Sequence, residues 1–537
     1  MDVLKVILCL LSVITLDAQT YSGLGETPQY WNDLGKADIN KARKLKPNIG
    51  VAKNVIIFLG DGMGISTVTA ARILKGQLQG QPGEESKLVF EEFPHVALSK
   101  TYNQDAQTPD SSATATAYYT GVKANLGTMG LDASARRSNC SFTDEAKIES
   151  ILDWSLAAGK SVGIVTTTRV THATPGALYA SIPERNWEND NDMADVANCS
   201  VKDIAAQLIE NPNIQVVFGG GRSKFLMNNT EDPENGIITD GRLDRDLVEE
   251  WKSIQNGKDR RYKYVWNKTD FDNINPQDTD YVMGLFESSH MQYVLDRDTD
   301  VAGEPTLAEM TEKAIDILKK NEKGFFLLVE GGRIDHGHHA SMAKRALHEV
   351  IAFDDAIRTG VTKTSESDTL IVTTADHSHV FTMGGYPSRG NDIFGLTDDK
   401  GEHLKLAGDS QPFTTLGYTN GPGGYATGLN ESRPNLTSVD TGHKDFVQQS
   451  GVKLESETHG GEDVGIYARG PMSHLFHGVH EQSYIAHVMA YSSCVGRYSD
   501  PESCAMVDVK ENEISSGSTM RMTVWMLAIS ALVYICI

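Results

Sequence analysis

Basic residues are in the minority among the charged residues of this 537-residue chain. The chain has 49 lysines and arginines against 72 aspartates and glutamates, which gives a formal net charge of -23. Such a negative surplus repels polyanions at long range, so we expect no nucleic-acid binding. A small anionic ligand would then need local attraction, from a metal ion or from a placed arginine.

A hydrophobic run long enough to span a membrane is missing as well. Residues 522–537 are apolar, but this run is shorter than the about 20 residues that a transmembrane helix needs, and no basic cluster follows it. Small residues precede it, an order typical of a glycosylphosphatidylinositol (GPI) attachment signal. We assign 506–537 to this signal and its removed tail, with Ser515 as the candidate attachment residue, beside Ser516 and Gly517.

The other end of the chain reads as a secretory signal over residues 1–18. Lys5 precedes the apolar run from Val6 to Leu16, and Ala18 offers a cleavage position. A buried first strand is the alternative interpretation. We therefore expect a protein of the secretory pathway, held by a lipid anchor on the extracellular face of the plasma membrane. Residues 19–50 would form an N-terminal arm, with a helix within Glu26–Lys46 that packs on another subunit.

Cysteine is scarce, with six residues in the chain. Removing both end segments takes away Cys9 and Cys536, and the four that remain form an even set in an oxidising compartment. Three connectivities are open. We favour Cys140 with Cys199, and Cys494 with Cys504 because this second pair closes a short loop. Secretion also agrees with the glycosylation sequons, which lie at Asn139, Asn198, Asn228, Asn267, Asn430 and Asn435.

Short β-branched runs alternate with periodic, helix-like stretches along most of the chain. The runs lie at 54–59, 161–167, 215–218, 324–329, 369–374 and 464–467, and the stretches at 148–158, 194–209, 307–320 and 340–357. This alternation predicts an α/β fold whose mostly parallel sheet is covered on both faces. Residues 51–383 and 452–505 would form the core, and the Gly-, Pro-, Asn- and Ser-rich stretch 384–451 an insertion.

Metal-capable side chains follow several of the predicted strands. Asp61 ends the apolar run 55–59 between glycines, and Glu330 opens a run that contains Asp335 and His339 four residues apart, a spacing that places both on one helical face. Asp376 and His377 follow another strand, and His459 lies in a glycine-rich loop. Strand ends of a parallel sheet meet at one edge, and mixed Asp and His ligands suit two zinc-type sites.

A nucleophile is available in the segment 108–116. Ser111 stands at the expected start of a helix, where N–H groups and the helix dipole favour a phosphate. Plain N-capping by Asp110 or Ser111 is the competing interpretation.

Together these motifs make the chain resemble the animal alkaline phosphatases of the membrane-bound, GPI-anchored type. The resemblance runs from Glu26 to about Cys504. It is carried by the run ending in Asp61-Gly-Met-Gly, by Pro109-Asp110-Ser111, by 170–175, by Asn186-Trp187, by 329–339, by Asp376-His377 and by 458–461. It implies a three-layer α/β/α sandwich, a crown-like insertion at 384–451 and a homodimer.

The resemblance also implies a role for each residue of the site. The first zinc would be held by Asp335, His339 and His459, the second by Asp376, His377 and Asp61, and one magnesium by Asp61, Thr174 and Glu330. Ser111 would be the nucleophile that forms a phosphoserine, Arg185 would clamp the phosphate, and His172 would lie just outside the magnesium ligands. An all-oxygen set suits magnesium, and arginine can bind two phosphate oxygens at once. The reaction implied is hydrolysis of phosphate monoesters.

A calcium site is implied as well, formed by Glu234, the carbonyl of Phe286, Glu287 and Glu304. The last position is usually an aspartate, so the longer Glu304 departs from the family pattern.

Two alternatives stay open at this point. A phosphodiesterase or nucleotide pyrophosphatase would share a two-zinc core but commonly uses threonine as nucleophile and lacks the third metal. Ser111, Thr174 and Glu330 favour the monoesterase. A lipid-anchored binding protein that keeps the core as a scaffold is the other, and the complete set of site residues argues against it.

Overall fold

A computed structural model describes residues 26–424 and 433–500 of the chain. The signal peptide predicted at 1–18, the GPI signal with Ser515, the sequon at Asn430 and Cys504 therefore lie outside the described residues. Within the described residues no helix is both long and apolar enough to cross a membrane.

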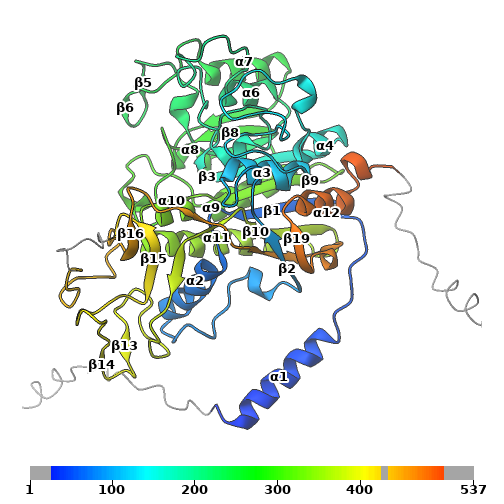
Figure 1. The fold of residues 1–537 in the computed structure, drawn as a ribbon. Coiled ribbons are helices and arrows are strands. Elements are labelled where there is room, and N and C mark those ends of the chain that lie inside the picture. Colours follow the sequence, from blue (N-terminus) through cyan, green and yellow to red (C-terminus); the bar gives the residue numbers. More distant parts are fainter. Residues whose placement is uncertain (1–25, 425–432, 501–537) are drawn as a thin grey trace, which may run out of the picture.

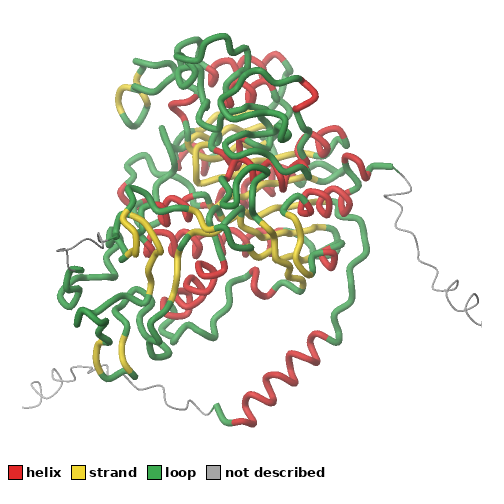
Figure 2. The backbone as a smooth tube through the Cα atoms, viewed as in Figure 1, coloured by secondary structure: helices red, strands yellow, loops and turns green. Residues whose placement is uncertain are grey.

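The centre of the molecule is a ten-stranded sheet (Figures 1 and 2). In spatial order its strands are β19 (Gly478–Glu481), β2 (His95–Lys100), β18 (Val464–Arg469), β10 (Thr369–Ala375), β1 (Asn54–Gly60), β9 (Phe325–Gly331), β3 (Ser161–Arg169), β4 (Val216–Gly220), β8 (Tyr281–Leu285) and β7 (Tyr262–Val265). Only β18 pairs antiparallel, with β10 on one side and β2 on the other. The mostly parallel sheet predicted from the sequence is confirmed.

The central strands are buried on both faces because their side chains alternate between two cores. Ile57 and Leu59 of β1 belong to one core, whereas Ile56 and Phe58 point into the other. The first core is covered by α3 (Ser111–Thr120), α4 (Ile151–Ala157), α6 (Ile204–Glu210), α7 (Leu247–Gly257) and α12 (Tyr484–Ser493). The second is covered by α2 (Ile65–Leu78), α8 (Lys268–Asp272), α9 (Leu307–Leu318) and α11 (Ala343–Lys363). The result is the predicted α/β/α sandwich.

Two short helices lie at the end of the sheet where the parallel strands finish, α5 (Ala173–Gly176) after β3 and α10 (Arg333–His339) after β9. Smaller sheets complete the fold. They are formed by β11 (Ser378–His379) with β17 (His459–Gly460), by β12 (Phe381–Met383) with β15 (Leu416–Gly421) and β16 (Ser450–Lys453), by β13 (Asp398–Asp399) with β14 (His403–Leu404), and by β5 (Glu231–Asp232) with β6 (Gly236–Ile237).

The first helix, α1 (Pro28–Ala42), stands away from the rest of the molecule (Figure 1). Thr27 caps it, accepting a hydrogen bond from the Tyr30 amide. No residue of α1 is buried, although it carries Trp31 and Ile39, which are 52% and 62% exposed. A helix was expected in this segment, and the described residues do not bury its apolar side chains.

The other predicted helices lie close to where the sequence placed them, with one clear exception. The stretch 194–209 is helical only from Ile204 onward, because Asp203 accepts a hydrogen bond from the Ala206 amide and so caps α6 at that point.

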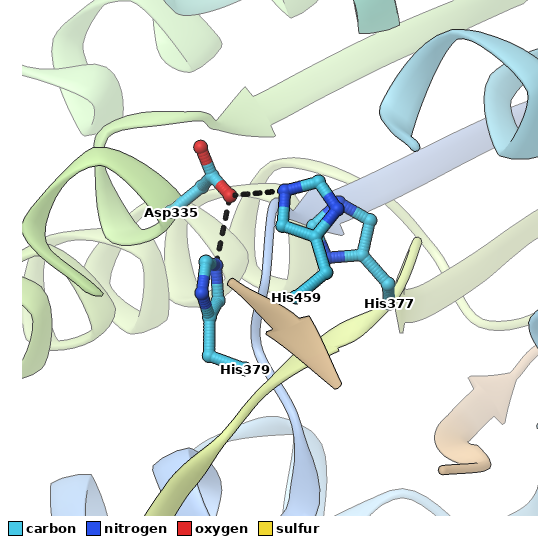
Figure 3. A group of neighbouring side chains, drawn as sticks. All are labelled: Asp335, His377, His379 and His459. Carbon is cyan, nitrogen blue, oxygen red and sulfur yellow. Dashed lines mark hydrogen bonds and ion pairs between the residues drawn. The ribbon is translucent and has the colours of Figure 1, made fainter. Parts of the chain in front are cut away.

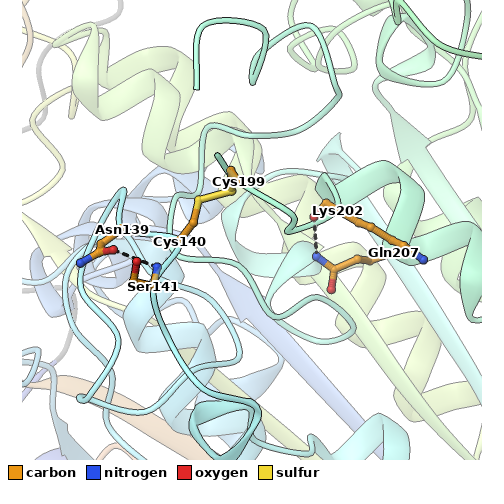
Figure 4. Close-up of a disulfide and its surroundings, with 6 residues drawn as sticks. All are labelled: Asn139, Cys140, Ser141, Cys199, Lys202 and Gln207. Carbon is orange, nitrogen blue, oxygen red and sulfur yellow. Dashed lines mark hydrogen bonds between the residues drawn. A yellow bond between two sulfur atoms is a disulfide. The ribbon is translucent and has the colours of Figure 1, made fainter. Parts of the chain in front are cut away.

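The predicted disulfide between Cys140 and Cys199 is present (Figure 4). It ties the loop between α3 and α4 to the segment between α5 and α6. Cys494 follows α12, and its pairing with Cys504 stays a prediction.

Candidate active site

Three acids reach one edge of the central sheet because β1 lies between β9 and β10. Gly60 of β1 stands opposite Gly331 of β9 and Ala375 of β10 in the parallel register. Asp61 and Asp376 directly follow their strands, and Glu330 is the next-to-last residue of β9. All three are buried. The prediction that strand ends bring these side chains together is confirmed.

A first ligand group gathers around Asp335, and Figure 3 shows two of its neighbours, His379 and His459. Oδ1 of Asp335 lies 3.3 Å from Nε2 of His339, one turn further along α10, and 3.4 Å from Nε2 of His459 on β17. The two imidazole nitrogens are 3.1 Å apart. Ligand atoms on a tetrahedral zinc ion at about 2.0–2.1 Å are separated by roughly 3.4 Å, so this set has the spacing of a zinc site.

His379 belongs to the same group, and the sequence analysis did not include it. Its Nε2 lies 2.8 Å from Oδ1 of Asp335, and its Nδ1 lies 2.5 Å from Oε2 of Glu457. Burial lowers the pKa of His379, but the hydrogen bonds to these two carboxylates raise it to about 9. The short pairing of β11 with β17 places His379 opposite His459. The spacing of residues along the chain does not reveal this pairing.

A second group consists of Asp61, Asp376 and His377. Nε2 of His377 lies 3.1 Å from Oδ2 of Asp376 and 3.6 Å from Oδ1 of Asp61. Burial, and then the neighbouring His459, lower the pKa of His377 well below its usual value, which keeps the ring neutral as a metal ligand must be.

A third group is centred on Glu330 and includes Asp61 and His172, whose ligand atoms all lie within 4.8 Å of one another. His172 precedes α5 and Thr174 lies on it. Oε2 of Glu330 accepts hydrogen bonds from the hydroxyls of Thr166 and Thr168 on β3. Burial raises the pKa of Glu330 to about 7. Asp61 is thus common to the second and third groups.

The buried oxygens of these groups lack hydrogen-bond donors. Both carboxylate oxygens of Asp61 have no partner, and the same holds for Thr174 Oγ1, Glu330 Oε1 and Asp376 Oδ2. Burial, together with the charges of Asp376, Asp335 and Glu330, raises the pKa of Asp61 well above its usual value. Buried carboxylates without donors are costly unless a cation neutralises them. The donor set therefore fits bound metal ions.

Ser111 is the first residue of α3 and faces the second ligand group. Its Oγ lies 3.1 Å from Nε2 of His377. The preceding Asp110 caps α3, and its Oδ2 also accepts a hydrogen bond from Nη1 of Arg185 at 3.1 Å. Burial would raise the pKa of Asp110, but Arg185 above all lowers it below its usual value. The capping role falls to Asp110, which leaves the hydroxyl of Ser111 free to act.

The residues expected to hold calcium lie in one region, just beyond the carboxyl end of β8 and apart from the three ligand groups. Glu287 and Glu304 are buried, and Gln292 donates hydrogen bonds to both carboxylates, from its side-chain amide to Glu287 and from its backbone amide to Glu304. Phe286, which precedes Glu287 in the chain, is also buried. Glu234 accepts from Arg222 at 3.0 Å. Burial raises the pKa of Glu234 to about 8 and that of Glu304 to about 7. Such crowded acids suit a cation.

The sequons differ in exposure. Asn139, Asn198 and Asn435 are exposed, while Asn228 and Asn267 are half-buried. Asn139 and Asn198 each precede a cysteine of the disulfide, and Asn139 accepts a hydrogen bond from the Ser141 amide (Figure 4).

Comparison with known proteins identifies the relatives of this chain. A family model described as alkaline phosphatase matches residues 52–495. The tissue-nonspecific isozyme of alkaline phosphatase from Homo sapiens is 52% identical over 482 residues, which cover 87% of this chain and 89% of that protein. An alkaline phosphatase from Gadus morhua is 51% identical over 480 residues, covering 88% and 98%.

Solved structures show the same fold. A cold-active alkaline phosphatase from the psychrophile Shewanella sp. is 25% identical with a TM-score of 0.55 and covers 82% of this chain and 99% of its own. The alkaline phosphatase of the Antarctic bacterium TAB5 is 21% identical with a TM-score of 0.57, covering 84% and 100%.

Proposed function

This chain belongs to the alkaline phosphatase family, and from that premise we propose that it hydrolyses phosphate monoesters to an alcohol and inorganic phosphate through a phosphoserine at Ser111. One observation carries the proposal. The hydroxyl at the start of α3 lies 3.1 Å from the ring of His377, within a cluster of buried Asp, Glu and His side chains whose oxygens lack donors.

Family members use metal ions, and the ligand groups divide between two kinds of ion. Asp335, His339 and His459 would hold one Zn²⁺, with His379 in contact with Asp335. Asp376, His377 and Asp61 would hold a second Zn²⁺, since mixed N and O ligands suit zinc. Asp61, Thr174 and Glu330 offer only oxygens and would hold Mg²⁺, with His172 beside them. The region of Glu234, Phe286, Glu287 and Glu304 would take Ca²⁺ in the same way.

Bound ions would lower the pKa of the Ser111 hydroxyl and of water and would offset charge on the phosphoryl group. Ser111 Oγ then attacks phosphorus as the bond to the alcohol oxygen breaks. Arg185 holds two phosphoryl oxygens through its guanidinium, which Asp110 keeps in place at 3.1 Å. The amides at the start of α3 face the same group. Water next breaks the phosphoserine and releases phosphate, with Ser111 restored.

A diesterase is the second candidate, and the third ligand group argues against it. Bis-(p-nitrophenyl) phosphate and p-nitrophenyl phosphate compared on one preparation would distinguish the two, since a diesterase prefers the former.

The cellular location and the oligomeric state of the enzyme are also proposals. A signal peptide at 1–18 and a GPI signal at 506–537 would place it on the outer face of the plasma membrane. The exposed apolar side chains of α1 support a homodimer, because a lone helix of this length is marginal in water without packing. The insertion 384–451, which holds β13, β14 and β15, would form the crown of that dimer.

The experiment that tests the reaction compares the wild type with Ser111→Ala, using p-nitrophenyl phosphate from mildly acidic to strongly alkaline pH. We expect wild-type activity to rise with pH, to vanish on chelation and to return with zinc and magnesium, because the nucleophile and ligands must be deprotonated. The variant should lose at least about a thousandfold in kcat, as removal of a nucleophile does in other enzymes, with unchanged metal content.

Ser155→Ala is the matched control, since Ser155 is equally buried on α4 but lies outside the site. Undiminished activity in Ser111→Ala would show that another residue is the nucleophile. A fully metallated but inactive wild type would favour the binding-protein alternative.

A further inference from the structure

A stretch of exposed basic residues lies between α1 and β1 and takes no part in the reaction. Residues 39–53 contain no acid and five bases, which are Lys41, Arg43, Lys44, Lys46 and Lys53. In the whole chain acids outnumber bases by 72 to 49, so this stretch runs against the composition. All five bases are exposed, and in the described part of the chain their side chains form no ion pair. Runs of this kind are typical of surfaces that bind polyanions.

A second basic run, at residues 258–263, differs in this respect. It holds four bases but also Asp259, and Arg261 forms a bidentate pair with Asp280, at 2.8 Å from each carboxylate oxygen. The positive charge of that run is therefore partly neutralised by its own neighbours. The charge of residues 39–53 is left for a partner to neutralise.

The basic stretch is fixed to the body at the end of the sheet that lies opposite the active site. The Asn48 carbonyl accepts a hydrogen bond from the Met472 amide at 2.7 Å, and the Ala52 amide donates to the Ser492 carbonyl at 2.7 Å. Lys53 then precedes β1, whose seven residues separate it from the ligand groups by about 20 Å. Figure 1 shows the chain running from α1 along the molecule to β1.

Two further bases extend this surface beyond Lys53. Nζ of Lys160 donates to the Lys53 carbonyl at 2.8 Å and to the Lys323 carbonyl at 3.0 Å. Nζ of Lys323 lies over Gly159, where an added Cβ would stand 2.8 Å from it. Burial, and then the charge of Lys53, lower the pKa of Lys160 to about 8. Glu322 offsets part of this charge, but three ammonium groups still crowd the starts of β1, β3 and β9.

The shape of this basic surface indicates which partner it fits. The bases at 41–46 lie on the end of α1 and on the linker, away from the body, whereas the other three follow the edge of the central sheet (Figure 1). A flat membrane would meet only part of such a path, but a flexible linear polymer can follow all of it. Sulfate groups along that polymer would accept charge-assisted hydrogen bonds from ammonium and guanidinium groups.

We propose that residues 39–53, together with Lys160 and Lys323, form a binding surface for a sulfated polysaccharide. This surface goes beyond the proposed phosphatase reaction and does not rest on it. The net charge of -23 repels such a polymer at long range, but salt screens that repulsion beyond about 8 Å at physiological ionic strength, while the bases act at contact. The secretory route proposed above would bring the enzyme and the polymer together outside the cell.

The test measures the binding of fluorescently labelled heparin, a sulfated polysaccharide, to the metallated full-length enzyme at about 0.1 M salt. In the triple variant Arg43→Gln, Lys44→Gln, Lys46→Gln, we expect Kd to rise about a hundredfold, since each base near an anionic surface contributes about fivefold. The slope of log Kd against log salt should fall by roughly 2 to 3. KM and kcat for p-nitrophenyl phosphate should stay within about twofold, because the active site is about 20 Å away.

Lys87→Gln with Arg136→Gln and Lys400→Gln is the matched control. It removes the same charge from three exposed bases that form no ion pair among the described residues, and Kd should change by less than about twofold. Equal losses in the two triple variants would show that heparin responds only to net charge, which would overturn the proposal. Failure of the wild type to bind heparin at this salt concentration would overturn it too.

A second variant keeps the result separate from assembly, because the first triple variant lies next to α1. Lys53→Gln with Lys323→Gln lies at the sheet edge and should raise Kd about 25-fold, with the mass from light scattering unchanged. An unchanged Kd there, or a loss of binding that occurs only when the mass falls, would contradict a continuous surface. Duplex DNA, or vesicles of phosphatidylcholine with phosphatidylserine, that bound as tightly as heparin would assign the surface to another class of partner.

Discussion

Asp110 joins the start of α3 to Arg185, the proposed phosphate clamp, through one carboxylate. Oδ1 accepts from the Gly127 amide and from Asn103, and Oδ2 accepts from Arg185. A residue that could be dismissed as a helix cap therefore also sets where a guanidinium lies. Both oxygens accept from amides at the start of α3, and Oδ2 in addition holds Arg185.

The substitution Asp110→Asn separates these roles. Asparagine caps a helix as well as aspartate does, but it carries no charge to hold Arg185. We expect KM for p-nitrophenyl phosphate to rise about tenfold, the effect of losing roughly 1.4 kcal/mol of a charge-assisted hydrogen bond. Thermal unfolding should change little. Steady-state kinetics measure the first effect and a melting curve the second.

Asp153→Asn is the control, since Asp153 belongs to a capping box on α4 and contacts no arginine of the site. A melting temperature that falls sharply in Asp110→Asn, with KM unchanged, would mean that the carboxylate serves the helix alone.

At this scale the sequence predicted residue types better than contacts. The family resemblance led us to expect Asp335, His339 and His459 at one ion, and they lie together. His379 and Glu457 were not expected, because their contact depends on the pairing of β11 with β17, two strands of two residues each. No periodicity can be detected in segments so short.

Among the elements, α6 shows how one side chain can decide where a helix begins. Asp203 caps α6 and also forms a bidentate pair with Arg242, at 2.8 Å and 2.9 Å. The Arg242 side chain is fully buried. The apolar periodicity of 194–209 continues upstream of this cap, which is why periodicity alone predicted a helix that was too long.

Asp203→Ala should therefore destabilise the fold more than the loss of a cap. A lost cap costs about 1 kcal/mol, whereas a buried arginine left unpaired costs roughly 3–5 kcal/mol. Residual contacts of Arg242 with Asp244 reduce this cost, so we expect a loss of about 3 kcal/mol in the free energy of unfolding. Denaturant unfolding of the metallated protein measures it.

Asp246→Ala is matched to it, because Asp246 caps α7 in the same way but is half-buried and has no buried arginine as partner among its hydrogen bonds. Equal losses in the two variants would show that the Arg242 pair contributes nothing.

The sequence located the six central strands because each is an apolar run, but it missed β2, β7, β8 and β19. β2 and β19 have alternating or exposed side chains at one edge of the sheet, and β7 is the opposite edge. Edge strands bury less apolar surface, so their pattern is weak. β8 is apolar but short, and its tyrosine and glycine interrupt the apolar run by which a strand is predicted.

For the whole molecule, the exposed side chains of α1 make a prediction about assembly. Trp31 and Leu34 are 52% and 43% exposed on a helix that packs on nothing else in the described chain. If a second copy covers them, Trp31→Asp with Leu34→Asp should convert a dimer to a monomer at micromolar concentration. Charges in an apolar interface cost several kcal/mol. Light scattering gives the mass.

Asn32→Asp with Asn40→Asp adds the same charge to the same helix at polar positions and should leave the dimer intact. A wild type that already has the mass of a monomer would refute the assembly, and a double Asp variant that stays dimeric would place the interface elsewhere.

The carboxylate of Asp61 stands in two ligand groups at once. An ion in either group would orient this side chain and relieve its buried charge before the other ion arrives. The two sites are then linked thermodynamically, and the linkage is reciprocal: whatever factor magnesium adds to the affinity for zinc, zinc must add to the affinity for magnesium. The enzyme would gain or lose its ions as a cooperative set, which would make its activity a steep function of the free metal concentration.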